Sequence, residues 1–167
     1  MFRAMARVRT HLKRPVYAVL GNHDSILMVP ALEEMGINIL LNENTVIKQG
    51  QGKLFLAGID DAHYFRADNI PQSAIGISST VPSILLSHTP AIYKQAAETG
   101  FDVTLAGHTH GGQIFPFNFL VKLQQPYVRG LHNHNEFTQV YVNKGTGFWG
   151  PPMRLGASSE ISLLTIT

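Results

Sequence analysis

The chain has 167 residues, of which 44% are hydrophobic and 14% charged, enough apolar content for one globular domain with a substantial core. It has no cysteine, which excludes disulfides and thiolate ligands, and no run of about eighteen apolar residues that would cross a membrane. Its first residues lack the apolar segment and cleavage site typical of a secretory signal, so we expect none here. Five of its thirteen basic residues lie in the first fourteen positions, which leaves eight basic against eleven acidic residues elsewhere, so we expect no nucleic-acid binding.

The first third of the chain is predicted to contain short helices and strands. Apolar residues at three- and four-residue spacing predict an amphipathic helix that ends before Pro15. It is either a surface helix packed on a sheet or a basic helix lying on a membrane. An apolar run then predicts a buried strand over 16–20. A helix over 30–35 follows, and then strands over 37–41, 45–48 and 53–59.

The rest of the chain continues this alternation. A buried strand is predicted over 82–86, then a helix over 90–98, which Gly100 ends, and a strand over 102–105. Residues 115–135 are rich in Pro, Asn and aromatics and are predicted to be irregular. Two further strands are predicted over 137–142 and 160–166. We expect a single α/β domain over residues 1–167.

Three groups of polar residues follow apolar runs, where predicted strands end. They are Gly21-Asn22-His23-Asp24, the single His88, and residues 107–113, which read Gly-His-Thr-His-Gly-Gly-Gln. Imidazole nitrogens and amide oxygens bind borderline and hard divalent cations. If the strand ends converge, they form a metal site. Taken singly, each residue is also typical of a turn or of a hydrogen-bonded structural histidine.

His23 is the candidate catalytic residue of these groups. It is adjacent to Asn22, and neighbouring side chains diverge, so it is not expected to bind the same cation. We predict that it faces the substrate as a general acid, or as a cation that stabilises developing charge. Asp24 would orient it and raise its pKa through a charge-assisted hydrogen bond. The alternative for Asp24 and Asn22 is turn formation alone.

In this order, the three motifs resemble those of the calcineurin-like binuclear metallophosphoesterases, most closely the bacterial branch whose last motif reads Gly-His-Thr-His-Gly-Gly-Gln. The similarity runs from about Val16 to the C-terminus. It implies an α/β fold of two face-to-face β-sheets flanked by helices. It also implies hydrolysis of phosphomonoesters or phosphodiesters by a metal-bound hydroxide. By this resemblance Asn22, His88 and His108 bind the second metal, His110 binds the first, and His23 and Asp24 are catalytic.

Two motifs that the resemblance implies do not precede Asn22. Family members open with Asp-x-His and Gly-Asp, which supply ligands to the first metal and a carboxylate that bridges both metals. The first twenty residues here contain no Asp or Glu. We therefore expect the C-terminal two-thirds of a family domain, without its first strands. Two dications about 3.5–4 Å apart repel strongly without an anionic bridge, so we expect one metal or none and weak or absent activity.

The expected ligands and partners follow from this interpretation. The metal would be Mn, Fe, Zn or Ni, and the substrate a phosphorylated small molecule or lipid. The missing strands would expose an apolar sheet edge, which a second copy would cover in a homodimer. We expect a cytoplasmic location or peripheral membrane contact through residues 1–14. The alternative to an enzyme is a non-catalytic metal-binding or partner-binding remnant of the fold.

Four further residues are predicted to contact substrate at the rim of the cleft. Asp60, Asp61 and His63 follow the strand over 53–59, where the alternative is a simple turn, and Arg154 would contact a phosphate. The aromatic pair 148–149 is expected to pack in the core, with contact to a phosphate or a lipid-like group as the alternative. His132 and His134 are expected in a surface loop.

Overall fold

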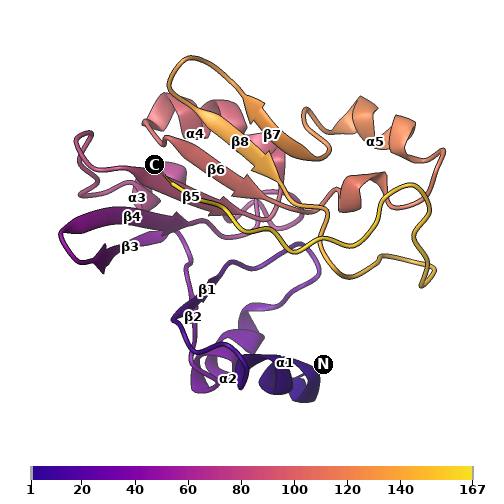
Figure 1. Ribbon diagram of the computed structural model, residues 1–167, viewed down its shortest axis with the longest axis horizontal. Coiled ribbons are helices and arrows are strands. Elements are labelled where there is room, and N and C mark those ends of the chain that lie inside the picture. Colours follow the sequence, from indigo (N-terminus) through magenta and orange to yellow (C-terminus); the bar gives the residue numbers. More distant parts are fainter. Residues whose placement is uncertain (1, 167) are drawn as a thin grey trace.

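The computed structural model describes residues 2–166, which form two β-sheets and a set of short helices (Figure 1). The strands of the larger sheet are β3 (Glu43–Gln49), β4 (Gly52–Gly58), β5 (Ser83–Ser87), β6 (Val103–Ala106), β7 (Gly130–Asn133) and β8 (Gln139–Val142). Their spatial order is β3-β4-β5-β6-β8-β7.

The middle of the larger sheet is parallel. β4, β5, β6 and β8 run in the same direction, while β3 and β7 pair antiparallel at the two edges. Ile84 and Leu85 are both buried, on opposite faces of β5, as in parallel sheets that are covered on both sides. Because β5 and β6 are parallel neighbours, the loops that follow them leave the sheet at the same edge, side by side.

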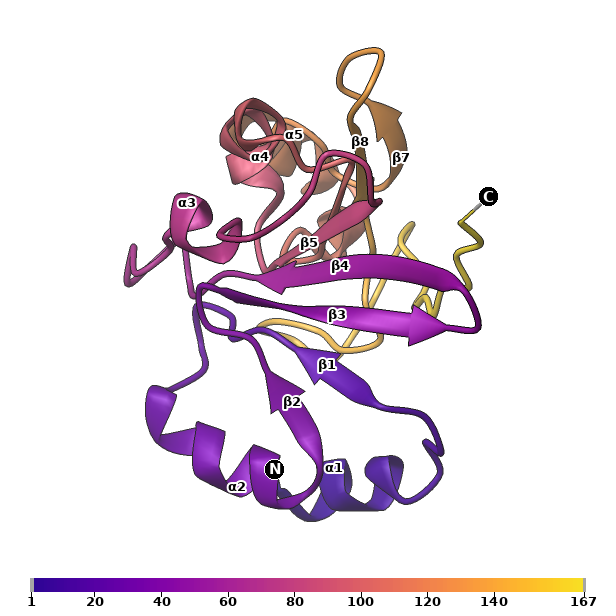
Figure 2. The ribbon, with the colours of Figure 1, turned by 90° about the vertical axis from the view of Figure 1, so that its left-hand side faces the viewer.

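Short helices cover one face of this sheet (Figure 2). In the apolar cluster between the two layers, Ile92 and Phe101 pack with Ile59 and Leu85. Gly100 ends the last of these helices with a φ of 95°, a left-handed conformation that glycine adopts without steric cost. The elements on this face are α3 (Ile70–Ser73), the 3₁₀ helix η2 (Pro90–Ile92) and α4 (Tyr93–Thr99).

The smaller sheet lies against the opposite face. Its two parallel strands are β1 (Val16–Ala18) and β2 (Ile37–Ile39), and its helices are α1 (Phe2–Arg9), the 3₁₀ helix η1 (Ile26–Met28) and α2 (Val29–Glu34). Tyr17 and Leu40 pack against Leu56 and Ile84 of the larger sheet. Met5 of α1 packs on the cluster around β2, which favours the surface-helix alternative for this segment.

Two predicted stretches were wrong. Residues 115–135, predicted to be irregular, contain α5 (Asn118–Gln124) and β7. Residues 160–166, predicted as a strand, form none. Their alternating pattern leaves Ile161 and Leu163 more than nine-tenths exposed, and no strand within residues 2–166 pairs with them.

The remaining strands occur where they were predicted, within two residues or so at their ends. The expected α/β fold of two sheets flanked by helices is confirmed. Among residues 2–166, no helix combines the length and the apolar character needed to cross a membrane. The single domain over 1–167 and the homodimer through a sheet edge stay predictions.

Candidate metal centre

Three loops bring Asn22, His88 and His108 together. His88 directly follows β5, and His108 follows its parallel neighbour β6 with only Gly107 between them. Asn22 lies in the loop after β1. The Gly107 amide donates to the His88 carbonyl over 3.1 Å, which joins two of the loops. All three side chains line one cavity of about 240 Å³. The convergence that the sequence predicted is therefore present.

The potential ligand atoms of these three residues lie very close to one another. Asn22 Oδ1 is 2.7 Å from His88 Nε2, which is 3.0 Å from His108 Nδ1. A divalent cation with ligand distances of about 2.0–2.2 Å separates two neighbouring ligands by about 3 Å in octahedral coordination and by about 3.4 Å in the tetrahedral coordination of zinc. The separations are close to those that one shared cation requires. The donor set therefore fits a single divalent metal.

The donor set contains no carboxylate. Within residues 2–166, no three His, Cys, Asp or Glu side chains are grouped to hold a metal, so the trio depends on the Asn22 amide. Asp24 is nearby, but its Oδ2 accepts the Gly21 amide over 2.8 Å. Three neutral ligands with open positions for water or substrate can hold one cation. A second cation beside it would have no anionic bridge among these residues.

Both imidazoles are kept neutral. Burial, together with the neighbouring His88 and His63, lowers the pKa of His108 to about 4. Burial also lowers the pKa of His88, although the charges of Asp61 and Asp24 oppose this shift. A neutral imidazole has a free lone pair, which a metal ligand needs. Neither ring has to lose a proton at neutral pH, but the proton that His88 Nε2 donates to Asn22 Oδ1 must move to the other ring nitrogen before Nε2 binds a cation.

The loop that carries His108 has an unusual backbone. His108, His110 and Gln113 have φ values of 66°, 52° and 46°, in the left-handed region that non-glycine residues rarely adopt. A Cβ on Gly112 would lie 2.4 Å from Asn118 Cβ, so only glycine fits there. Such strain costs about 1–3 kcal/mol per residue and is concentrated at functional sites. The loop conformation turns both imidazoles toward the cavity.

His23 lies where a catalytic residue would contact a substrate. Its side chain is exposed and lines the same cavity as the three potential ligands. The expected hydrogen bond between His23 and Asp24 is not formed in the part of the chain that the structure describes. Asp24 instead closes its own turn, because it accepts the Gly21 amide and its amide donates to the Gly21 carbonyl. The catalytic roles of both residues stay predictions.

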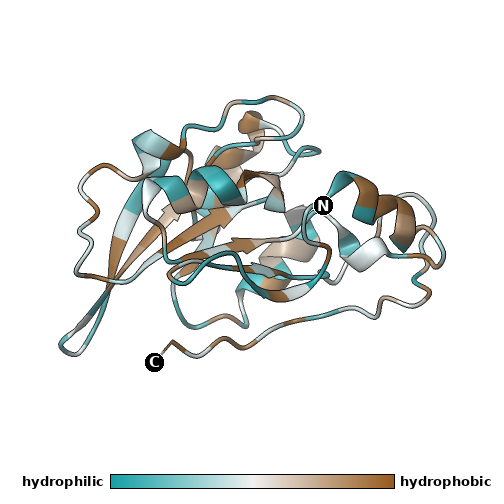
Figure 3. Cartoon of the chain, turned by 90° about the horizontal axis from the view of Figure 1, so that it is seen from above, coloured by the Kyte–Doolittle hydropathy of each residue, from teal (hydrophilic) through white to brown (hydrophobic). Residues whose placement is uncertain are grey.

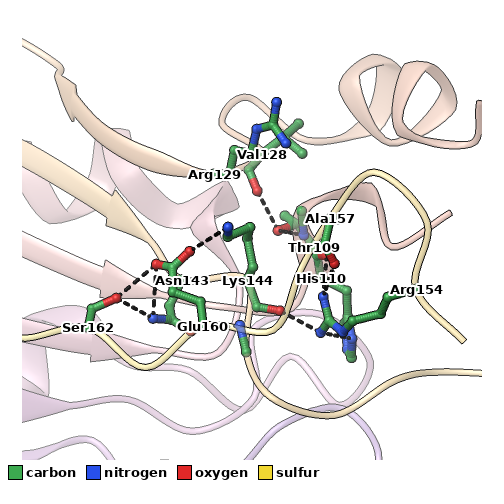
Figure 4. Close-up of polar contacts among 12 residues, drawn as sticks. Thr109, His110, Val128, Arg129, Asn143, Lys144, Arg154, Ala157, Glu160 and Ser162 are labelled. Atoms are coloured by element: carbon green, nitrogen blue, oxygen red, sulfur yellow. Dashed lines mark hydrogen bonds and ion pairs between the residues drawn. The ribbon is translucent and has the colours of Figure 1, made fainter. Parts of the chain in front are cut away.

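His110 is held by Arg154, which lies 44 residues further along the chain (Figure 4). Arg154 Nη2 lies 3.4 Å from His110 Nδ1, and Arg154 Nη1 donates to the His110 carbonyl over 3.1 Å. Burial and the Arg154 charge lower the pKa of His110, and a hydrogen bond to the Gly147 backbone opposes this. Since Arg154 can only donate, Nδ1 accepts. That nitrogen is directed at a guanidinium, and binding of a metal by His110 stays a prediction.

Arg154 links several backbone segments. Its guanidinium donates to the carbonyls of Gly147 and Lys144 over 2.8 Å each and of Ala157 over 3.1 Å, in addition to that of His110. The guanidinium of Arg154 is therefore already hydrogen-bonded to backbone carbonyls of the protein. Some of these hydrogen bonds would have to open before Arg154 contacts a substrate phosphate.

The segment after β4 reaches the site through one imidazole. The His63 ring lies 4.6 Å from that of His108, measured between centroids. Asp61 is buried and accepts the amides of His63, Tyr64 and Phe65. Burial alone would raise the pKa of Asp61, but these hydrogen bonds lower it overall. Asp61 therefore fixes the turn that presents His63, while Asp60 only accepts the Asp61 amide. Contact of these three residues with substrate stays a prediction.

Part of the cavity wall was missed by the sequence analysis. Val121 and Gln124 of α5 and Trp149 line the cavity together with the histidines. Gln113 is fully buried and holds the Trp149 backbone with both ends of its amide, over 2.7 Å each. The helical spacing of Phe117, Leu120 and Val121 was the available signal for α5.

The sequence is similar to those of curated metallophosphoesterases. An uncharacterized metallophosphoesterase of Campylobacter jejuni is 39% identical over 90% of this chain and 41% of its own length. One of Helicobacter pylori is 37% identical over 90% of this chain and 42% of its own length. A Danio rerio protein named transmembrane protein with metallophosphoesterase domain is 36% identical over 90% of this chain and 38% of its own length. No family model and no solved structure matches the chain.

The similarity to these relatives over about 90% of the chain supports the calcineurin-like metallophosphoesterase family that its motifs resembled. The chain spans about 40% of the length of these curated relatives. Because one of them is a vertebrate protein, the similarity is not confined to bacterial proteins.

Proposed function

We propose that this chain forms the metal-binding part of a metal-dependent phosphoesterase that hydrolyses phosphomonoesters or phosphodiesters. The observation that carries the proposal is the convergence of Asn22 Oδ1, His88 Nε2 and His108 Nδ1, with separations of 2.7 and 3.0 Å. The similarity to proteins named metallophosphoesterases supports the same reaction class. The site would hold one Mn, Fe, Zn or Ni ion per chain.

Each residue of the site has a distinct role in this proposal. Asn22, His88 and His108 would hold the cation, and a cation there would supply Lewis-acid polarisation of a phosphoryl oxygen and of water. His23, exposed in the same cavity, would donate a proton to the leaving oxygen of the ester. His63, against His108, would limit the rotation of that ring.

The protein that contains this chain would act in the cytoplasm or at a membrane surface. No helix among residues 2–166 is suited to cross a membrane, while one relative is named a transmembrane protein. Asp60, Asp61 and His63 would contact a bound substrate, and Arg154 would do so once some of its hydrogen bonds to backbone carbonyls open.

A second candidate function is a non-catalytic metal-binding module. One observation favours it. The two carboxylates nearest the imidazoles, those of Asp24 and Asp61, are both committed to backbone amides. Neither is free to bridge a second cation, so the described residues provide one cation site rather than the pair that the family uses.

Hydrolysis of 4-nitrophenyl phosphate and bis(4-nitrophenyl) phosphate in the presence of Mn²⁺ separates the two candidates. The enzyme predicts release of nitrophenol that His88→Ala abolishes and His23→Ala lowers by about 10²–10⁴-fold, with metal still bound by His23→Ala. His134→Ala, in the exposed β7–β8 hairpin, is the control. Metal binding without hydrolysis of either ester would establish the non-catalytic module.

A further inference from the structure

Two segments surround the mouth of the metal-site cavity with exposed apolar side chains. One is α5 with the turn before it, and the other is the loop over 148–155, both at the right-hand end of the molecule in Figure 1. In Figure 3 the apolar residues of α5 lie at the surface of the same end. We call this surface the apolar rim. Its side chains are each half or more exposed: Phe115, Phe117, Phe119, Leu120, Leu123, Phe148, Trp149, Met153 and Leu155.

The rim borders the cavity, because Trp149 of the rim and residues of α5 line it. Val121 and Gln124 of α5 face the cavity, while Leu120 and Leu123 on the same helix are 58% and 83% exposed. α5 buries none of its own residues, so its apolar side chains are not part of the protein core. Leaving nine large apolar side chains in water around one opening is unfavourable, and contiguous patches of this kind mark interaction surfaces.

The fold holds the rim in place. Gln113 fixes the Trp149 backbone through two hydrogen bonds of 2.7 Å, although the indole is 52% exposed. The Phe115 amide donates to the Leu155 carbonyl over 2.8 Å, which joins the two segments of the rim. Their exposure is therefore built into the structure, because buried polar contacts position the two segments with their apolar side chains outward.

The charge around the rim is positive. Residues 103–159 contain four basic residues and a single acidic one, Glu136, which lies in the hairpin between β7 and β8. Lys122 and Arg129 are exposed beside the rim. Lys144 pairs with Glu160 instead (Figure 4). A protein interface would normally have a mixed polar border. Phe, Leu and Trp side chains bordered by cations are the composition that binds an anionic lipid surface.

We propose that the apolar rim is a membrane-binding surface that inserts into the headgroup region of an anionic bilayer. α5 has seven residues, so it would lie at the surface, with Leu120, Leu123 and Trp149 at the boundary of the acyl chains. The cavity mouth would then face the lipid headgroups. The site would act on phosphate groups carried by lipids, a step that rests on the proposed phosphoesterase function.

Trp149 provides a direct probe, because it is the only tryptophan in the chain. Vesicles of equimolar phosphatidylglycerol and phosphatidylcholine should shift its emission to the blue, and bromine atoms on the acyl chains should quench it. Pure phosphatidylcholine should bind much more weakly, since it does not attract Lys122 and Arg129. Emission that is unchanged by the anionic vesicles, or equal binding to both kinds, would overturn the proposal.

Variants of exposed residues separate the rim from other surfaces. Leu120→Ser with Leu123→Ser should weaken vesicle binding by about tenfold per leucine. Ile26→Ser with Leu27→Ser is the matched control, since these side chains of η1 are also exposed but lie outside the rim. Arg3→Glu with Arg7→Glu tests the basic helix α1. Loss of binding only in the α1 variant would contradict the assignment to the rim, and circular dichroism would confirm that each variant folds.

Two further readouts complete the test. A blue shift that grows with protein concentration without vesicles, together with a dimer in sedimentation, would show that a second copy covers the rim and would overturn the proposal. Vesicle binding should persist with a chelator. Binding without any metal uptake or ester hydrolysis would contradict the proposed phosphoesterase function, while it would still support the membrane surface.

Discussion

Gly21→Ala should damage the metal centre without removing any ligand. Gly21 is buried and directly precedes Asn22. A Cβ built on it would lie 2.7 Å from His88 Nδ1, 2.8 Å from Cε1 and 3.0 Å from Cγ of the same ring. Three atoms of a planar ring are involved, so no single bond rotation of a flexible side chain relieves the contact. Either the ring or the Gly21 loop must move.

The size of the effect follows from these distances. Carbon atoms in contact prefer about 3.5–4.0 Å, so the His88 ring must move by close to 1 Å relative to Gly21. Metal sites tolerate deviations of about 0.2 Å in ligand distance. We therefore expect metal affinity to fall about 10–100-fold, the range typical of lost ligand support. Overpacking of this kind also lowers the free energy of unfolding, by about 1–3 kcal/mol.

Titration calorimetry with Mn²⁺, combined with urea unfolding of the metal-free chain, measures both quantities. Gly147→Ala is the matched control, because a Cβ there meets no atom within 4 Å and Gly147 has no positive φ. The control should retain the affinity and stability of the parent chain. If Gly21→Ala folds and binds Mn²⁺ as tightly as the control, His88 is not held against Gly21 in the binding conformation and the reasoning fails.

Three other predictions concern the surroundings of the site. His88 and His108 have lowered pKa values in the folded chain, so the unfolded chain binds more protons between pH 6.5 and about 4. The free energy of unfolding of the metal-free protein should therefore fall as the pH decreases through this window. Urea unfolding at several pH values measures this, and His108→Phe should flatten the dependence. Asp61→Ala should lower the free energy of unfolding by about 3 kcal/mol, because three amides lose a buried charged acceptor. Asp60→Ala should lower it by less than about 1 kcal/mol, since Asp60 accepts a single amide. Equal losses of stability would contradict the role of Asp61. Arg154→Lys should loosen the 144–157 loop, because a single ammonium cannot reach the carbonyls of Lys144, Gly147 and Ala157 together. The measurement is amide hydrogen exchange, which should become faster in this loop. Unchanged exchange would mean that Arg154 does not hold the loop.

The sequence predicted the centre of this structure well. Each of Asn22, His88 and His108 lies shortly after an apolar run that contains a strand. Because β5 and β6 are parallel neighbours, the loops with His88 and His108 leave the larger sheet at the same edge. The motif spacing therefore carried enough information to place the three side chains together. The confirmed strands share this property, since their apolar runs are buried on one or both faces.

Other features depended on tertiary contacts that a local pattern does not contain. α5 was missed because its apolar side chains lie around the cavity mouth rather than in the core. Phe148 and Trp149 were expected to pack in the core because they are aromatic, but they lie at the cavity mouth and are exposed. Residues 160–166 have a strand pattern, but none of the strands in the described part of the chain pairs with them. The partners of Arg154 and Gln113 are backbone groups far along the chain, which composition does not reveal.

Metal binding by the chelator-treated chain tests the central claim most directly. Calorimetric titration with Mn²⁺ and Zn²⁺ should show one equivalent per chain, and His88→Ala or His108→Ala should abolish it, because each removes one of three converging ligands. His134→Ala should leave the titration unchanged. Absence of binding by the parent chain, or binding that survives the loss of both His88 and His108, would contradict a metal centre formed by these loops.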